Sequence, residues 1–167
     1  MKILLSVLLI ILTAHALNAQ RPSPSKKLII LVRHAEKADN TNADPDLSPA
    51  GRDRAKRLIG AIGKYRPGAF FSTDFKRTRD TIAPLAKRRN KQLQIYDAKK
   101  PRDLIDAIAV SKTKRIVIAG HSNSIPGLAN LLIKKDLFKN LDESEYTVIW
   151  LVRIKDGQVR TVELLDY

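Results

Sequence analysis

The feature that most constrains the fold is the run of five apolar residues at 28–32, which leads directly into Arg33 and His34. A continuous apolar run predicts a strand that is buried on both faces, as in the parallel sheets of α/β proteins. Sheets of this kind bind their ligands beyond the carboxyl ends of the strands. The sequence therefore places an arginine and a histidine at the edge where such a sheet does its chemistry.

Strands and helices are predicted to alternate along the rest of the chain. Further strands are expected at 69–72, 93–96 and 115–120. Helices are expected to begin at Ser48-Pro49, at Asp74 and at Pro101, and a fourth to cover 124–133. The segments 146–154 and 159–165 flank Asp156-Gly157, a dipeptide that favours hairpin turns. This order predicts an α/β fold, a three-layer sandwich whose mainly parallel sheet has helices on both faces and ends in a C-terminal β-hairpin.

The first residues have the layout of a secretory signal peptide. Met1-Lys2 is followed by an almost wholly apolar run at 3–12 and by small residues up to Ala19. That run has only about half of the ~20 residues that a membrane-spanning helix needs. We expect a signal peptide at 1–19, a linker at 20–26 and one folded domain at 27–167. The mature protein would then be periplasmic or secreted, without a stable membrane anchor.

Charge and composition restrict the partners of the protein. The 31 lysines and arginines outnumber the 17 acidic residues, which gives a formal net charge of +14 and favours anionic partners. One Trp, four Tyr and four Phe offer few surfaces for base stacking, so no nucleic acid is expected. The absence of cysteine excludes disulfides, zinc–thiolate sites, thiol nucleophiles and lipid anchors on cysteine.

Two histidines are placed for chemistry. Of the three in the chain, His15 lies in the predicted leader, whereas His34 and His121 each follow a strongly apolar strand directly. Both should therefore lie at the same edge of the sheet. No carboxylate cluster accompanies them to complete a coordination shell, so we expect no metal and no cofactor.

The segment that contains His121 also invites a serine-hydrolase interpretation. Residues 120–124 read Gly-His-Ser-Asn-Ser, which is similar to the Gly-x-Ser-x-Gly nucleophile elbow except at Ser124. That elbow requires a histidine later in the chain than its serine. No histidine follows His121, so chain order argues against this interpretation.

An arginine completes a predicted oxyanion pocket. Arg77 lies at the opening of the helix that follows the 69–72 strand, close to the edge that carries His34 and His121. Arg79 instead fits an ordinary exposed helical position. Arginine binds phosphate through a planar fork of donors, and the helix that begins at Ser124 adds partial positive charge.

Four ordered motifs carry a family resemblance. They are Arg33-His34-Ala35-Glu36, Leu47-Ser48-x-x-Gly51, Ser72-x-Asp74-x-x-Arg77-x-x-x-Thr81 and Gly120-His121-Ser122. On these residues the chain resembles the histidine phosphatase superfamily, the phosphoglycerate-mutase-like group. Its Arg-His-Ala-Glu-Lys version looks like the small SixA-like or exported members. The resemblance covers about residues 27–133. Ala35 stands where the family usually has glycine.

The resemblance implies a role for each motif residue. His34 would be the nucleophile that becomes phosphorylated, and Arg33, Arg77 and His121 would hold the phosphoryl group. A leaving alkoxide also needs a proton donor, which many family members place as a glutamate after the third strand. Asp97 occupies that region here and is the predicted donor. Glu36 and Asp74 are its rivals.

We therefore expect a metal-independent hydrolase that acts on phosphomonoesters or on phosphohistidine. The short loops predict an open pocket, which suits a phosphorylated small molecule, polymer or protein. Two alternatives stay open at this point. One is a catalytically weak protein that binds phosphate or a polyanion, and the other is a phosphoglycerate-type mutase, against which the short chain argues.

Overall fold

The computed structural model describes residues 26–39 and 41–167. The predicted signal peptide and its cleavage position after Ala19 lie outside the described residues, as do positions 20–25 of the predicted linker. In chain order the elements are β1 (Lys26–Arg33), α2 (Pro49–Ile62), the short 3-10 helix η1 (Gly63–Tyr65), β2 (Ala69–Ser72), α3 (Lys76–Arg88), β3 (Leu93–Ile95), α4 (Pro101–Val110), β4 (Arg115–Gly120), α5 (Ser124–Ile133), β5 (Val148–Lys155) and β6 (Gln158–Asp166).

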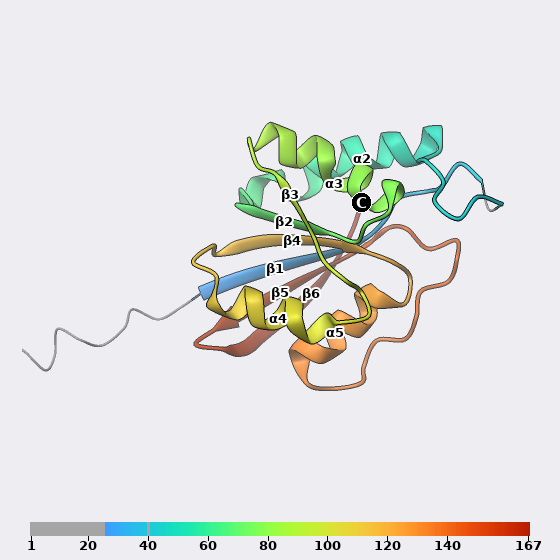
Figure 1. The fold of residues 1–167 in the computed structure, drawn as a ribbon. Helices are drawn as coiled ribbons and strands as arrows, with labels where there is room; N and C mark the ends of the chain where they lie inside the picture. Colours follow the sequence, from blue (N-terminus) through green and yellow to red (C-terminus); the bar gives the residue numbers. More distant parts are fainter. Residues whose placement is uncertain (1–25, 40) are drawn as a thin grey trace, which may run out of the picture.

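The six strands form one mixed sheet in the order β3-β2-β4-β1-β5-β6. The neighbouring pairs β1–β4, β4–β2 and β2–β3 are parallel, whereas β5 is antiparallel to both β1 and β6. Helices α2 and α3 cover one face, and α4 and α5 cover the other (Figure 1). The predicted three-layer α/β fold with a C-terminal hairpin is confirmed.

The apolar run of β1 fills both faces of the sheet. Its residues 28, 30 and 32 pack in the core cluster that contains Leu58 of α2 and Ile82 of α3. Its residues 29 and 31 pack on the opposite side with Leu104 of α4 and Leu128 of α5. Successive side chains of a strand point to opposite faces, so only an unbroken apolar run satisfies two cores. This central position fixes the carboxyl end of β1, where Arg33 and His34 lie.

Helix α2 begins as predicted, and helix α3 begins later than predicted. The Ser48 hydroxyl accepts a hydrogen bond from the Gly51 amide at 3.0 Å and caps α2. The sequence predicted that α3 starts at Asp74, but the helix starts at Lys76. The Lys76 amide donates to the Asp44 carboxylate at 2.8 Å. A side chain from a distant loop therefore satisfies this helix end, which no local pattern could predict.

The C-terminal hairpin turns at Asp156-Gly157, as expected. Both residues have positive φ, 53° and 74°, which is the backbone that the favoured two-residue hairpin turn requires. The first strand of the hairpin starts at Val148, two residues after the predicted start. Tyr146 is therefore outside the strand, and its ring is free to reach the site described below.

The segment 134–147, between α5 and β5, contains neither helix nor strand. Asn130 anchors its beginning, since the side-chain amide donates to the Phe138 carbonyl at 2.8 Å and accepts from the Phe138 and Leu137 amides. Farther along, the Leu141 amide donates to the Ser122 carbonyl at 2.9 Å. The segment thus returns to the edge of the sheet where β4 ends. Among the residues that the structure describes, no helix is long and apolar enough to cross a membrane.

Candidate active site

His34 follows β1 directly and is only 4% exposed. Its Nδ1 lies 2.8 Å from the carbonyl oxygen of Ala35. A carbonyl can only accept a hydrogen bond, so we assign the ring proton to Nδ1. The lone pair of the neutral ring then lies on Nε2. The backbone therefore presets the tautomer that a nucleophilic Nε2 requires.

His121 follows β4, and its ring centroid lies 5.3 Å from that of His34 in an edge-on arrangement. Its Nε2 lies 3.0 Å from the Thr73 hydroxyl, which lies 2.8 Å from the Thr78 hydroxyl. Thr78 donates its single hydroxyl proton to the Phe75 carbonyl. Thr78 must then accept from Thr73, and Thr73 from His121. This chain of donors assigns the His121 proton to Nε2 and leaves Nδ1 with a lone pair.

Both histidines are neutral at pH 7. Burial, together with the nearby charges of Arg33 and Arg77, lowers the pKa of His34 to about 3. The same causes lower the pKa of His121 to about 4. Protonation would remove the lone pair on which nucleophilic attack depends. The environment therefore keeps the predicted nucleophile in its reactive form.

Arg33 is the most deeply buried charged residue of the site, at 1% exposed. Its Nη1 donates to the carbonyl oxygens of Asp142 and Glu145 at 2.6 and 2.8 Å. The guanidinium also stacks over the Tyr146 ring, 4.2 Å from its centroid. Its Nε is buried and has no hydrogen-bond partner in the part of the chain that the structure describes. A buried donor without an acceptor is costly, so this atom is poised for an anion.

Arg77, in the first turn of α3, repeats this pattern. Its guanidinium stacks over the Phe75 ring at 4.4 Å, and Nη1 lies 3.7 Å from the Asp44 carboxylate. Its Nε is also buried and lacks a partner within residues 26–39 and 41–167. Arg33 and Arg77, the two arginines predicted to bind phosphate, thus each have a buried Nε–H group that forms no hydrogen bond within the described residues. Such fixed donors suit a group with several anionic oxygens.

Thr81, the last residue of the third motif, links the turn after His34, the predicted nucleophile, to Arg77. Its hydroxyl accepts from the Ala35 amide at 2.8 Å and donates to the Arg77 carbonyl at 2.7 Å. This hydroxyl therefore joins the turn after β1 to the first turns of α3. Sequence reasoning placed Thr81 in a motif but assigned it no task.

The two motif glycines are required by close packing. A Cβ on Gly51 would lie 2.2 Å from the carbonyl oxygen of Glu36, which accepts from the Ser48 amide. A Cβ on Gly120 would lie 2.7 Å from the Ser124 hydroxyl. That hydroxyl accepts from the His121 amide at 2.9 Å. Each glycine therefore lets another segment approach and fix the backbone beside one of the histidines.

The three carboxylates predicted as proton donors are engaged elsewhere. Asp97 caps the turn before α4, since its Oδ1 accepts from the Lys99 amide at 2.8 Å. Glu36 forms a bidentate ion pair with Arg54, with a closest approach of 2.7 Å. Asp74 pairs with Arg79. Among the described residues, none of these carboxylates forms a hydrogen bond or ion pair with His34 or His121, so a donor role for Asp97 stays a prediction.

Glu143 and Tyr146 belong to the site, and sequence reasoning missed both. An oxygen of the Glu143 carboxylate lies 3.4 Å from Nη2 of Arg33 and 3.5 Å from Nζ of Lys37. Although partial burial opposes the shift, these two cations hold the pKa of Glu143 below its ordinary value. The Tyr146 ring centroid lies 6.1 Å from that of His34. Both residues come from the irregular segment 134–147, which shows no motif or periodicity that could have revealed them.

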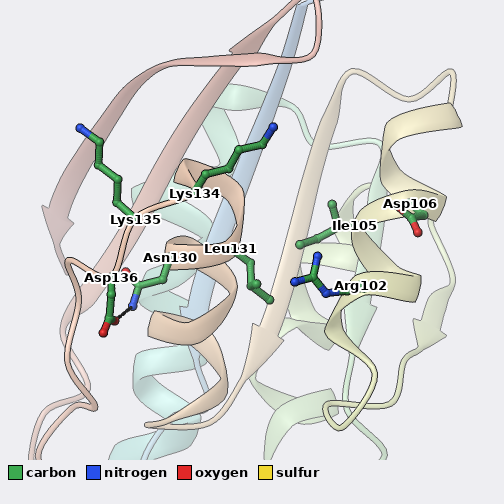
Figure 2. A pocket seen from close by; sticks show the side chains of 8 residues that line it. All are labelled: Arg102, Ile105, Asp106, Asn130, Leu131, Lys134, Lys135 and Asp136. Atoms are coloured by element: carbon green, nitrogen blue, oxygen red, sulfur yellow. Dashed lines mark hydrogen bonds between the residues drawn. The ribbon is translucent and has the colours of Figure 1, made fainter.

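A separate hollow of about 560 Å³ lies between α4 and α5. Figure 2 shows Arg102 pointing into it from α4, toward Leu131 of α5. Asn130 at its other side contacts Asp136 at 3.0 Å. Neither histidine lines this hollow, so it is distinct from the site. Within the described residues, no group of three or more His, Cys, Asp or Glu side chains is arranged to hold a metal ion.

Comparisons with known proteins agree with this arrangement. Residues 29–104 match the model of the histidine phosphatase superfamily (branch 1), a stretch that contains His34 and Arg77 and ends before His121. No curated protein sequence is significantly similar to the chain.

Solved structures share the fold at low identity. A mycobacterial glucosyl-3-phosphoglycerate phosphatase has a TM-score of 0.67 and 15% identity, over 85% of this chain and 98% of that one. A protein assigned as the phosphohistidine phosphatase SixA from Agrobacterium tumefaciens has a TM-score of 0.63 and 19% identity, over 84% and 99% of the two chains. A protein from Escherichia coli K-12 assigned as an alpha-ribazole-5′-P phosphatase has a TM-score of 0.69 and 12% identity, over 84% and 96%.

Residues 29–104 therefore match the histidine phosphatase superfamily, and the shared fold and the histidine pair at the carboxyl edge of the sheet agree with this match.

Proposed function

We propose that this protein hydrolyses phosphomonoesters or phosphohistidine through a phosphohistidine intermediate on Nε2 of His34. The observation that carries the proposal is the hydrogen bond from Nδ1 of His34 to the Ala35 carbonyl, at 2.8 Å. It directs the lone pair of a neutral, buried ring to Nε2. A nucleophile prepared in this way supports covalent catalysis better than a purely binding role.

The reaction divides into two displacements. Nε2 attacks phosphorus and forms a P–N bond while the bond from phosphorus to the leaving group breaks, which is P–O in a phosphomonoester and P–N in phosphohistidine. The departing oxygen or nitrogen takes up a proton. Water then attacks the phosphohistidine, the P–N bond breaks, and inorganic phosphate is released. Arg33 and Arg77 stabilise the negative charge on the oxygens of the transferring group by hydrogen bonds from their buried Nε–H groups.

His121 would bind the phosphoryl group as a cation. Its Nε2 proton is engaged by Thr73, so the neutral ring offers only a lone pair at Nδ1. An anionic oxygen beside Nδ1 would favour protonation of this nitrogen. Phosphate binding should therefore be coupled to proton uptake by His121.

Two carboxylates compete as donor to the leaving group. Asp97 stays a candidate by its position in the chain. Glu143 contacts Arg33 directly, and a phosphate that displaces it from this arginine would also raise its pKa by like-charge repulsion. Substitution of the true donor should slow the hydrolysis of alkyl phosphates and spare p-nitrophenyl phosphate, whose leaving group needs no proton.

The remaining features of the proposal are the substrate, the absence of a metal and the location. The Glu143 side chain is 71% exposed, so the site has an open side that suits phosphate on a small molecule, polymer or protein. The solved structures that share the fold include proteins named as phosphatases for glucosyl-3-phosphoglycerate and for phosphohistidine, which supports this range. We propose that arginines supply the positive charge that a metal ion would otherwise provide, and that chelators leave the activity unchanged.

The signal-peptide pattern at 1–19 supports export of the protein. Intact-mass measurement of the protein from cells tests this proposal, and a mass that still includes residues 1–19 would contradict it.

The His34→Ala variant tests the mechanism. We expect it to lose turnover of p-nitrophenyl phosphate and acid-labile phosphoryl labelling, while Ser122→Ala retains both. Full turnover by His34→Ala would overturn the mechanism. A wild-type protein that binds phosphate but hydrolyses no phosphoester would favour the binding alternative, and transfer of the phosphoryl group to a second sugar phosphate instead of water would favour the mutase.

A further inference from the structure

The strongest charged feature outside the site is a groove of about 530 Å³. Eight of its eleven lining residues are Lys or Arg, and none is acidic. Lys26 and Lys27 enter it from the start of β1, Lys114 and Arg115 from the start of β4, and Lys64 from η1. These segments are far apart in the sequence, so only the fold gathers their charges.

The hairpin supplies the rest of the groove. Lys155, at the end of β5, and Arg160, in β6, are both exposed. Arg153 also lines the groove and pairs with Glu163 at 3.1 Å. Among residues 26–39 and 41–167, no other cation of the groove forms a salt bridge with a carboxylate. The positive charge of this surface is therefore largely uncompensated by the protein.

The groove lies at the opposite end of the sheet from the histidines. β1 begins at Lys26, which lines the groove, and ends at Arg33, the residue before His34. Figure 1 shows the course of this strand through the middle of the sheet. At about 3.3 Å per residue, the eight residues of this strand separate the two ends by roughly 25 Å. An anionic surface bound at the groove would therefore leave the catalytic edge facing away from it and open to substrate.

Two observations favour a lipid surface over a nucleic acid. Among the described residues that line the groove, Tyr65 is the only aromatic one, and its ring is covered by Lys64 with Nζ 5.3 Å from the centroid, so bases find no free surface for stacking. Before the predicted cleavage, the chain also carries the apolar run at 3–12 in addition to these cations. An apolar segment combined with a basic patch is the two-part arrangement that holds proteins on membranes. The cations belong to residues 26 onward, so they persist even after cleavage at Ala19.

We propose that this basic groove binds the surface of an anionic phospholipid bilayer. The test is co-sedimentation of the full chain with vesicles of phosphatidylcholine, with and without phosphatidylglycerol. We expect much stronger binding when phosphatidylglycerol is present. Because each cation near an anionic bilayer contributes about fivefold to partitioning, the Lys114→Glu/Arg160→Glu variant should bind these vesicles at least about 25-fold more weakly.

The matched control is Lys99→Glu/Lys100→Glu, which changes the net charge by the same amount. These exposed lysines precede α4, at the other end of the sheet. The control should retain most of the binding, and both variants should keep the wild-type thermal unfolding midpoint and p-nitrophenyl phosphate turnover. Equal binding to both vesicle types would overturn the proposal, as would an equal loss in the two variants. Binding to duplex DNA that is lost in the groove variant, without vesicle binding, would assign the groove to nucleic acid instead.

Discussion

A carboxylate oxygen of Glu143 lies 3.4 Å from Nη2 of Arg33, so an anion from the chain itself rests on a predicted phosphate ligand. The backbone beside it is bound more firmly, since the carbonyls of Asp142 and Glu145 accept from Nη1 of the same arginine. The carboxylate is exposed and can be exchanged, whereas the carbonyl contacts hold the guanidinium in place. The site thus carries a replaceable carboxylate where phosphate is proposed to bind.

Replacing this carboxylate should strengthen phosphate binding. In Glu143→Gln the competing negative charge is gone, so we expect inorganic phosphate to bind about three- to tenfold more tightly at low salt, an effect that salt reduces. Inhibition of p-nitrophenyl phosphate hydrolysis by phosphate measures this affinity. Glu145→Gln, in the same segment, should leave it unchanged. An unchanged or weaker affinity in Glu143→Gln would show that the carboxylate does not compete.

Stability should fall as the pH is lowered through the range in which the unfolded histidines become protonated. The pKa of His34 is lowered to about 3 and that of His121 to about 4 in the folded protein, against about 6.5 when unfolded. Between these pKa values the unfolded state binds more protons than the folded state. The free energy of unfolding should therefore be highest above about pH 6.5 and should fall as the pH is lowered toward 4. Urea unfolding at several pH values between 7.5 and 4.5 gives the change of this free energy with pH, which should be smaller in His121→Gln. An identical slope in that variant would refute the assignment.

The close approach at Gly51 predicts a large effect for a small substitution. In Gly51→Ala the new methyl group would collide with the Glu36 carbonyl, and overpacking of this kind costs about 1–3 kcal/mol. The turn after His34 would move, so turnover should fall together with the free energy of unfolding. Gly60→Ala is the control in the same helix. Its Cβ meets nothing within 4 Å, and helix propensity should make this variant about 0.5–1 kcal/mol more stable. Equal stability of the two variants would contradict the packing argument.

Loss of the Thr81 hydroxyl should uncouple the predicted nucleophile, His34, from Arg77. Thr81→Val keeps the shape of the side chain but leaves the buried Ala35 amide without its acceptor, at a cost of about 1–3 kcal/mol. We expect a lower kcat for p-nitrophenyl phosphate because the turn that holds His34 loosens. Thr161→Val, on the exposed face of β6, should change neither stability nor rate appreciably. Wild-type kcat in Thr81→Val would show that the link has no role in positioning.

Local patterns were sufficient for most of the fold. The unbroken apolar run of β1 predicted a strand between two cores, because an alternating pattern can fill only one. Ser48-Pro49 and Asp156-Gly157 predicted a helix start and a hairpin turn through their own backbone preferences. The predicted helix start at Asp74 was wrong by two residues, because the carboxylate that receives the Lys76 amide comes from Asp44.

The sequence by itself determined which groups meet at the carboxyl edge of the sheet: His34 and His121 follow parallel neighbours β1 and β4, and Arg77 opens the helix after β2. Such groups converge because parallel strands end at one edge. Only the tertiary structure decided which carboxylates are engaged and which one reaches the site. Asp97 is held by its own turn, while Glu143 arrives on an irregular segment that Asn130 and Ser122 fix in place. Contacts of that kind depend on chain segments that meet only after folding, and no local periodicity encodes them.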